Sequence, residues 1–196
     1  MRQLPNRKTI RLNGWDYGRN AAYFVTICTS GRNHFFGQII NGSMHLSEIG
    51  VIAQDFWQKI PQHFQHTSLD AYAIMPDHIH GIVIIDKPRG IDETGEMDNM
   101  NNGDGNDCRV VACNNPTINK PSEIAVHRYM SSISPKPGSL STIIRSYKSA
   151  VTKRAHQIDP EFAWQSRFYD HVVRNPDSHD RIKQYIHNHL KSKIPN

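Results

Sequence analysis

The chain has 196 residues, of which 37% are hydrophobic and 21% are charged, and its formal net charge is +5 at pH 7. This size fits one domain, residues 1–196, and neither an apolar run near the roughly 18 residues of a membrane span nor a secretory signal in residues 1–14 is present. The three cysteines are too few for a disulfide framework, so we expect a cytoplasmic protein without membrane contact.

The first half of the chain predicts a strand, a hairpin and a helix. Residues 21–29, AAYFVTICT, are rich in β-branched and aromatic residues, which is typical of a central strand. Asn41 and Gly42 stand between apolar residues and predict a tight hairpin turn. Ser47 can then cap a helix that ends by Pro61, because apolar residues recur at helical spacing between them.

Two further predicted strands are followed by a segment without periodicity. Residues 68–75 and 78–86 predict strands joined by a short turn. Residues 87–138 are rich in Asn, Gly, Asp, Pro and Ser, and we expect a flexible insertion there. Residues 91–108 hold six acidic residues and no Lys or Arg, so the rest of the chain is more basic than its net charge indicates.

Regular patterns return at Leu140. Apolar residues at helical spacing from Leu140 to Val151 predict a helix, and residues 167–175 predict a last strand. Asp177 is then expected to cap a final helix. This irregular order of strands and helices favours an α+β domain with a mainly antiparallel sheet.

Four residues form a candidate catalytic set. His78 and His80 alternate along a strand, so they face the same side and could chelate a divalent metal ion. Tyr185 and His189 are four residues apart on a helix and share one face, so they could supply a nucleophile and a third ligand. Each also has an ordinary interpretation: two surface histidines on a half-exposed strand, a core tyrosine and a histidine on a helix surface.

Four segments carry a resemblance to a known family: KTIRLNGWDYGRNAAYFVTICT, MPDHIHGIVI, WQSRFYDHVVRNPD and RIKQYIHNHL. Together they resemble the REP-associated tyrosine transposases of the HUH endonuclease superfamily. The resemblance implies a ferredoxin-like (RRM-like) antiparallel sheet, a divalent ion, Mg²⁺ or Mn²⁺, and a covalent phosphotyrosine intermediate with single-stranded DNA. By position, His78 and His80 match the metal-binding pair, Tyr185 the nucleophile and His189 the third ligand.

The chain departs from the family pattern at two points. Asp77 stands where Asn is commoner, which adds a negative charge beside the expected ion. His189 places an imidazole where an amide is usual, and this favours softer, transition-type ions over magnesium. The departure leaves open whether His189 or Asn188 reaches the metal, although helical geometry favours His189.

The expected activity is cleavage and rejoining of hairpin DNA through a 5′-phosphotyrosine, which supports DNA transposition. An unaided phenol has a pKa near 10, so only about one in a thousand is ionised at pH 7, and the reaction needs an ion and nearby cations. Backbone phosphates should dominate affinity. The cations expected to contact DNA are Arg7, Lys8, Arg11, Arg145, Lys148, Arg167 and Arg174.

The aromatic residues outside this set have two possible uses. Trp15, Tyr17 and Trp164 could stack on unpaired bases or pack in the core. Tyr169 is expected to be a packing residue in its strand or a DNA contact, and Tyr147 a core residue.

Three alternative functions are compatible with the sequence. The protein could bind DNA hairpins without cutting them, it could be a replication-type nickase, or it could be a small regulatory module that uses His-x-His for a metal. A nickase of this chemistry usually brings further domains, for which 196 residues leave no room. The sequence also leaves open a monomer that acts in cis or a homodimer that exchanges its tyrosine helices.

Overall fold

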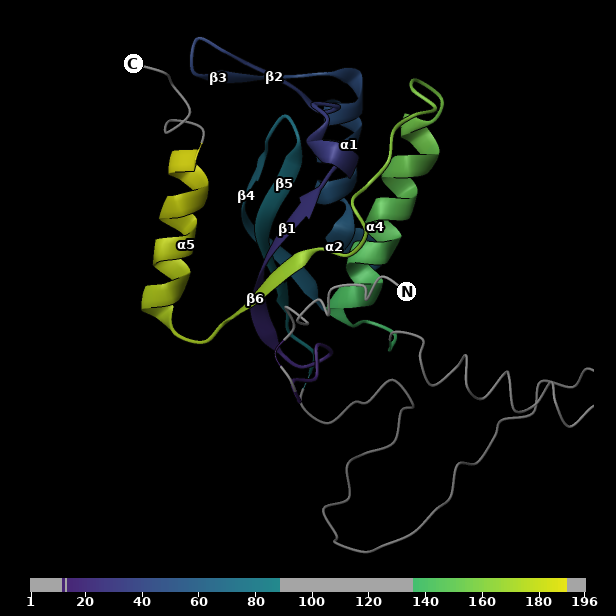
Figure 1. Ribbon diagram of the computed structural model, residues 1–196. Helices are drawn as coiled ribbons and strands as arrows, with labels where there is room; N and C mark the ends of the chain where they lie inside the picture. Colours follow the sequence, from purple (N-terminus) through teal and green to yellow (C-terminus); the bar gives the residue numbers. More distant parts are fainter. Residues whose placement is uncertain (1–11, 13, 89–135, 190–196) are drawn as a thin grey trace, which may run out of the picture.

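The described part of the chain, residues 12, 14–88 and 136–189 of a computed structural model, is built around a four-stranded sheet (Figure 1). Every neighbouring pair of strands is antiparallel. The strands lie in the order β4 (Thr67–Ile74), β5 (His78–Ile85), β1 (Ala21–Cys28) and β6 (Tyr169–Val173). The predicted α+β class with an antiparallel sheet is confirmed. Most of the predicted insertion, 87–138, lies outside the described residues.

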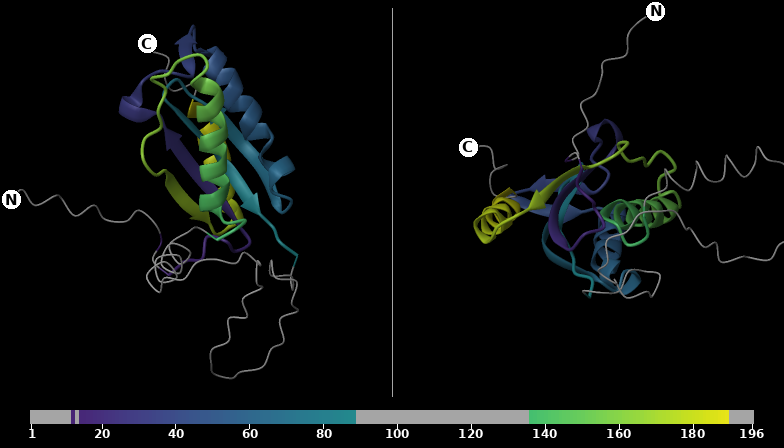
Figure 2. Two further views of the ribbon diagram at one scale, coloured as in Figure 1. Left: turned by 90° about the vertical axis from the view of Figure 1, so that its right-hand side faces the viewer. Right: turned by 90° about the horizontal axis from the view of Figure 1, so that it is seen from below.

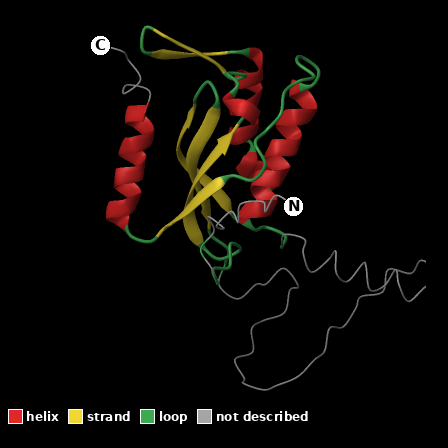
Figure 3. Cartoon of the chain, viewed as in Figure 1, coloured by secondary structure: helices red, strands yellow, loops and turns green. Residues whose placement is uncertain are grey.

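Helices cover both faces of this sheet (Figures 2 and 3). One face carries α1 (Glu48–Gln58), the short α2 (Ile60–His63) and α4 (Leu140–Ala155), while α5 (Pro176–His189) lies on the other. A separate hairpin, β2 (Gly37–Ile40) and β3 (Ser43–Leu46), follows the 3₁₀ turn η1 (Ser30–Arg32). Among the described residues, each helix is either too short or too polar to cross a bilayer.

Local sequence signals explain the hairpin and the start of α1. Asn41 and Gly42 have φ angles of 49° and 74°, as a type I′ turn requires, and they join β2 to β3 as predicted. Ser47 caps α1, because its Oγ accepts a hydrogen bond from the Gly50 amide at 3.0 Å. The same hydroxyl donates to the Phe35 carbonyl at 2.6 Å, which fixes the chain entering the helix.

The main core lies between the sheet and the α1/α4 face. Tyr147 of α4 is 3% exposed, and its hydroxyl donates to the Ala53 carbonyl at 2.9 Å, so its predicted core position is confirmed. Gly81 of β5 allows this close packing. A Cβ there would lie 2.7 Å from the Cβ of Tyr72 and 2.9 Å from Cζ2 of Trp57.

A smaller apolar cluster joins α5 to the other face of the sheet. Ile186 is 1% exposed and packs with Ala73 and Ile82, and Ile182 and Phe24 lie against them. Few apolar side chains therefore hold α5 in place.

The predicted cap of this helix was wrong. Asn175 supplies the capping oxygen, which accepts from the Ser178 amide at 2.8 Å, and the helix begins at Pro176. Proline suits the first helical position because it lacks the amide hydrogen that has no partner there, so Asp177 falls within the first turn.

Candidate active site

The two histidines of β5 face α5. His78 is 6% exposed and His80 is 1% exposed, whereas Ile79 between them is buried on the α1/α4 side. On the neighbouring strand, Cys28 lies opposite His78 and Thr26 opposite His80. The alternation predicted from the sequence therefore places both imidazoles on one face, next to the C-terminal half of α5.

The last turns of α5 bring Tyr185 and His189 to the same place. The ring of His189 lies 4.8 Å from that of His80 and 5.4 Å from that of His78, and the rings of His78 and His80 are 5.2 Å apart, between centroids. The Tyr185 ring lies 5.6 Å from His80 and 5.1 Å from His189. All four predicted residues converge within a single chain. Tyr185 is 50% exposed, so its phenol is accessible from solvent.

Two other candidates on α5 point elsewhere. Asn188 is exposed, while the ring of His189 is packed against the histidine pair. His187 is also exposed, and its Nδ1 lies 2.8 Å from the Lys183 carbonyl of its own helix. Of the two residues that the sequence left open as third ligand, His189 has the position for it.

The spacing of the three imidazoles can be compared with that of a metal site. Three imidazoles on one ion, with metal–nitrogen distances of about 2.1 Å, have ring centroids about 4.5–5.2 Å apart. The observed separations of 4.8, 5.2 and 5.4 Å are close to this range. As the side chains stand, no group of three or more His, Cys, Asp or Glu in the described residues could hold an ion. The ring spacing is therefore close to that of three imidazole ligands, but the side chains of the described residues do not form a metal site as they are placed.

Asp77 orients the first histidine. Its Oδ1 lies 2.6 Å from Nδ1 of His78, and its Oδ2 lies 3.1 Å from Nη1 of Arg32. Because an ionised carboxylate can only accept, the His78 proton belongs on Nδ1, and the lone pair of the neutral ring is on Nε2. Burial raises the pKa of Asp77, but the hydrogen bond with His78, the positive charge that this ring carries when protonated, and the Arg32 guanidinium outweigh burial, so the pKa is lower than usual. This is the arrangement that commonly orients a metal-binding histidine.

The turn before His78 is held by backbone hydrogen bonds. The carbonyl of Asp77 accepts from both the amide and the hydroxyl of Thr29, at 3.0 and 2.9 Å. The Pro76 carbonyl accepts from the Phe36 amide at 3.0 Å, and the His78 carbonyl from the Met75 amide at 2.8 Å. The first histidine therefore stands on a fixed turn rather than on a free loop end.

An acidic residue of β4 anchors α5. Asp70 contacts Nε2 of His179 through Oδ2 at 3.0 Å and Nζ of Lys183 through Oδ1 at 3.1 Å. Asp70 was not among the residues predicted from the sequence; its one local signal is a charge inside an otherwise apolar predicted strand. Arg32 was not predicted either, because it lies 45 positions from Asp77 along the chain and carries no local signal of the contact.

The cations predicted to bind DNA are in different positions. Arg167 and Arg174 are exposed, one before and one after β6. Arg145 is exposed on α4, which covers the face of the sheet that does not carry α5 and the histidine cluster. Lys148 donates to the carbonyls of Gln165 and Arg167 at 2.8 and 3.2 Å, and burial lowers its pKa. Lys148 therefore holds the segment that contains Gln165 and Arg167, and its contact with DNA stays a prediction. Arg7, Lys8 and Arg11 lie outside the described residues.

The three proposed stacking residues are engaged in packing. Tyr17 is 9% exposed in the main core, and Trp15 packs against that core with its Nε1 donating to the Tyr23 hydroxyl at 3.3 Å. Trp164 lies against Phe36, with ring centroids 5.4 Å apart. For these residues the packing interpretation is the one that the structure favours.

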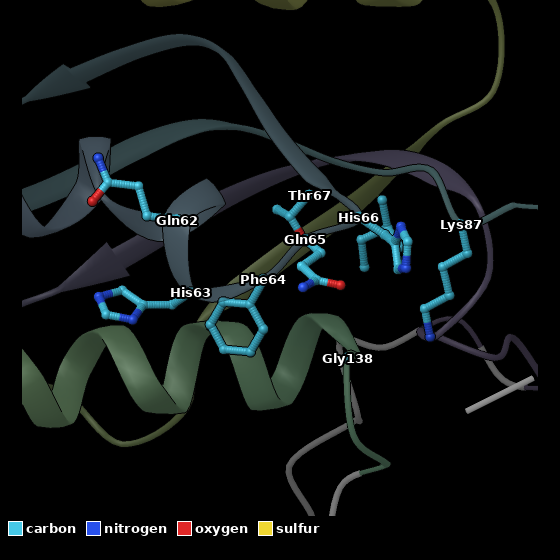
Figure 4. Close-up of a pocket in the computed structure, with 9 residues that line it drawn as sticks. Gln62, His63, Phe64, Gln65, His66, Thr67, Lys87 and Gly138 are labelled. Carbon is cyan, nitrogen blue, oxygen red and sulfur yellow. The ribbon is translucent and has the colours of Figure 1, made fainter. Parts of the chain in front are cut away.

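A surface pocket lies at the other end of β4 and β5 (Figure 4). Its volume is about 450 Å³, and His63, His66, Thr67 and Lys87 are among the residues that line it. Thr67 pairs with Ile85, seven positions along β5 from His78. The pocket is therefore separate from the histidine cluster.

Comparison with known proteins gives one relative by sequence. No protein-family model matches the chain. A protein of Haemophilus influenzae (strain ATCC 51907 / DSM 11121 / KW20 / Rd), described as uncharacterized, is 30% identical over 190 residues, which cover 94% of this chain and 88% of that protein. The chain belongs to the same family as this protein. The relationship covers most of both chains but brings no activity with it.

Comparison of structures gives a similar fold. The structure of a REP-associated tyrosine transposase bound to a REP hairpin matches with a TM-score of 0.50 and 13% identity, over 88% of this chain and 68% of that one. At this identity the match shows the fold alone. The sheet and its helices thus form a transposase-like fold, in agreement with the fold class predicted from the sequence.

Proposed function

We propose that this protein cuts and rejoins single-stranded DNA at hairpins, with Tyr185 as nucleophile. The proposal rests on one observation above all: the half-exposed phenol of Tyr185 lies beside His80 and His189, with ring centroids 5.6 and 5.1 Å away, in the same chain. A phenol is a poor nucleophile unaided, and neighbouring groups that could hold a metal ion or stabilise charge would support its attack on a phosphate.

The proposed reaction includes a divalent cation, which three imidazoles suit by their chemistry once the side chains turn toward one point. His78, His80 and His189 would hold Mg²⁺ or Mn²⁺, and three imidazoles favour the transition ion. When bound, the ion supplies positive charge to the scissile phosphate and to the departing 3′-oxygen. Asp77 keeps the proton of His78 on Nδ1, so the ring can offer Nε2 as a ligand.

The reaction exchanges one phosphoester for another. The phenol oxygen of Tyr185 forms a bond to phosphorus as the bond to the 3′-oxygen breaks, the phenol gives up its proton, and the 3′-oxygen takes one up. The products are a 5′-phosphotyrosine and a free 3′-hydroxyl. Because the phosphoester remains, the 3′-hydroxyl of another strand can attack it and release Tyr185, which rejoins DNA without ATP.

Hairpin DNA is the proposed substrate for two reasons. The REP-associated tyrosine transposase with the similar fold is bound to a REP hairpin in its structure. The present chain is also basic overall, with Arg167 and Arg174 exposed near β6. Phosphate contacts of this kind fix the register of a strand, while its sequence is recognised by other contacts.

A direct test looks for the covalent adduct. The protein is incubated with Mn²⁺ or Mg²⁺ and hairpin oligonucleotides that are labelled 3′ of the expected cut and taken from the DNA flanking its own gene. The native chain should give a labelled protein band. Tyr72→Phe is the control and should give the same band, because the Tyr72 hydroxyl accepts a hydrogen bond from Gln58 outside the cluster. Tyr185→Phe should give none. An adduct formed equally well by Tyr185→Phe would show that another residue is the nucleophile.

A second test asks whether each site comes from one chain. His80→Ala and Tyr185→Phe chains are each expected to be inactive, and a mixture of the two should be inactive as well. If the tyrosine helix were exchanged between copies, some mixed dimers would contain one intact site. Recovery of up to one quarter of the native activity in an equimolar mixture, about the statistical maximum for random dimers, would mean that the site is shared.

A further inference from the structure

Beside the tyrosine and histidine cluster lies an aromatic surface that the proposed reaction does not use. We propose that Tyr169, supported by Phe24, is a stacking subsite for one unpaired nucleobase of the DNA strand that Tyr185 cuts. This inference rests on the proposed function, because it names the part of the substrate that lies next to the cleaved phosphate.

The first support is the position of Tyr169 on the sheet. Asp170 and Val172 of β6 are buried toward the α4 side, so Tyr169 points to the α5 side. Its ring lies 6.3 Å from that of Phe24 at an interplanar angle of 70°. Phe24 is in turn 6.1 Å from the ring of Tyr185. One phenylalanine therefore supports both tyrosines.

The second support is the register of the strands. Tyr169 pairs with Thr26, and Thr26 pairs with His80 on its other side. Neighbouring strands are about 4.8 Å apart, so the backbone of Tyr169 lies about 10 Å from that of His80. A base on Tyr169 would thus leave its neighbouring phosphates within reach of Tyr185 and the histidines.

The third support is exposure. Tyr169 is 44% exposed. Of the Phe, Tyr and Trp side chains that the structure describes, Tyr169 and Tyr185 are the two that are exposed. Burying an aromatic ring is favourable, so a ring left open at the rim of a candidate active site is suited to a flat ligand. Trp15, Tyr17 and Trp164 lack such an open position because they pack on the core.

The fourth support is the charge along the same strand. Arg167 and Arg174 are exposed two residues before and five residues after Tyr169, and β6 is an edge strand of the sheet. A single DNA strand could therefore follow this edge with its phosphates near the cations and one base on the ring. An aromatic ring between cations suits a nucleic acid better than an apolar peptide.

Binding measurements on uncut DNA test the subsite. Every protein carries Tyr185→Phe, so that no strand is cleaved, and the DNA is a hairpin with an unpaired flank. Tyr169→Ala should weaken binding about 5- to 150-fold, while Tyr169→Phe should retain it. Tyr169→Leu keeps an apolar contact with Phe24 and repeats the test if the alanine variant does not fold. Val51→Ala, on exposed α1, is the control.

Abasic oligonucleotides locate the base. An abasic site at one particular unpaired position should make the Tyr169→Ala and Tyr169 proteins bind equally, while abasic sites elsewhere should preserve their difference. The proposal is overturned if Tyr169→Ala binds the intact oligonucleotide as tightly as its parent, or if no single abasic position removes the difference. Adduct formation is scored separately in chains with Tyr185 intact. If the native chain forms no adduct while Tyr169→Ala still weakens DNA binding, the proposed function is contradicted and the subsite is not.

Discussion

The attachment of α5 to the sheet through Asp70 gives a quantitative prediction. This helix carries both Tyr185 and His189, yet its buried apolar contact is confined to Ile186 with Ile182 beside it. Asp70→Ala removes both ionic contacts of the helix with β4 and leaves the apolar ones. We expect the fold to persist and the helix to detach from the sheet more often.

The magnitude follows from the exposure of the partners. Asp70, His179 and Lys183 have side chains 24%, 26% and 37% exposed, so each pair is partly screened by water. Exposed pairs contribute about 0.2–1 kcal/mol each, and His179 is a charged partner only when protonated. The Lys183 pair alone gives up to about 1 kcal/mol, and both pairs give up to about 2 kcal/mol when His179 is protonated, which corresponds to about a 5- to 30-fold rise in the detached population.

Hydrogen exchange measures this opening directly. Amides of 182–186 should exchange about 5- to 30-fold faster in Asp70→Ala, while those of β1 and β5 should be unchanged. Adduct formation at saturating DNA should fall once the detached state is well populated, with little change in DNA affinity. Asp180→Asn, on the same helix but exposed, is the matched control. Unchanged exchange of α5 in Asp70→Ala would refute the anchoring role of this carboxylate.

Three further predictions concern the metal site and the core. His80→Ala, or a chelator added to the native chain, should abolish adduct formation, and calorimetry with Mn²⁺ should detect weaker binding in the variant. Burial raises the pKa of Tyr147 well above its ordinary value of 10.0, so its contribution to stability is complete below about pH 10 and is lost above it. Tyr147→Phe should cost about 1 kcal/mol at neutral pH and flatten the fall in the urea midpoint above pH 10. Gly81→Ala should destabilise the fold by about 1–3 kcal/mol in urea titrations, because its Cβ would lie 2.7 Å from that of Tyr72.

Local signals in the sequence predicted the elements that local physics decides. The Asn41-Gly42 turn, the Ser47 cap and the alternation around His78 and His80 each depend on residues a few positions apart, and the structure agrees with all of them. The start of α5 was misplaced because two capping side chains compete there, and only the three-dimensional path of the chain selects Asn175.

Contacts between distant parts of the chain were beyond local signals. Asp70 meets α5 more than one hundred positions later, and Arg32 meets Asp77 across the sheet end. Lys148 was expected on DNA because it is a cation on a helix, but its neighbours include two backbone carbonyls that attract its charge. The charge of a residue in the sequence therefore does not identify its contact partner, which depends on the fold.

The described residues that flank the long polar segment after β5 lie close together, because Lys87 and Gly138 line the same pocket. They are at the end of β5 opposite to His78, about 23 Å along the strand. Because the free energy of closing a loop rises by only about 0.6 kcal/mol for each doubling of its length, a fluorescent reporter inserted directly after Lys87 would add little to the closure cost. The chain thus offers a permissive fusion position from which DNA engagement could be followed by energy transfer.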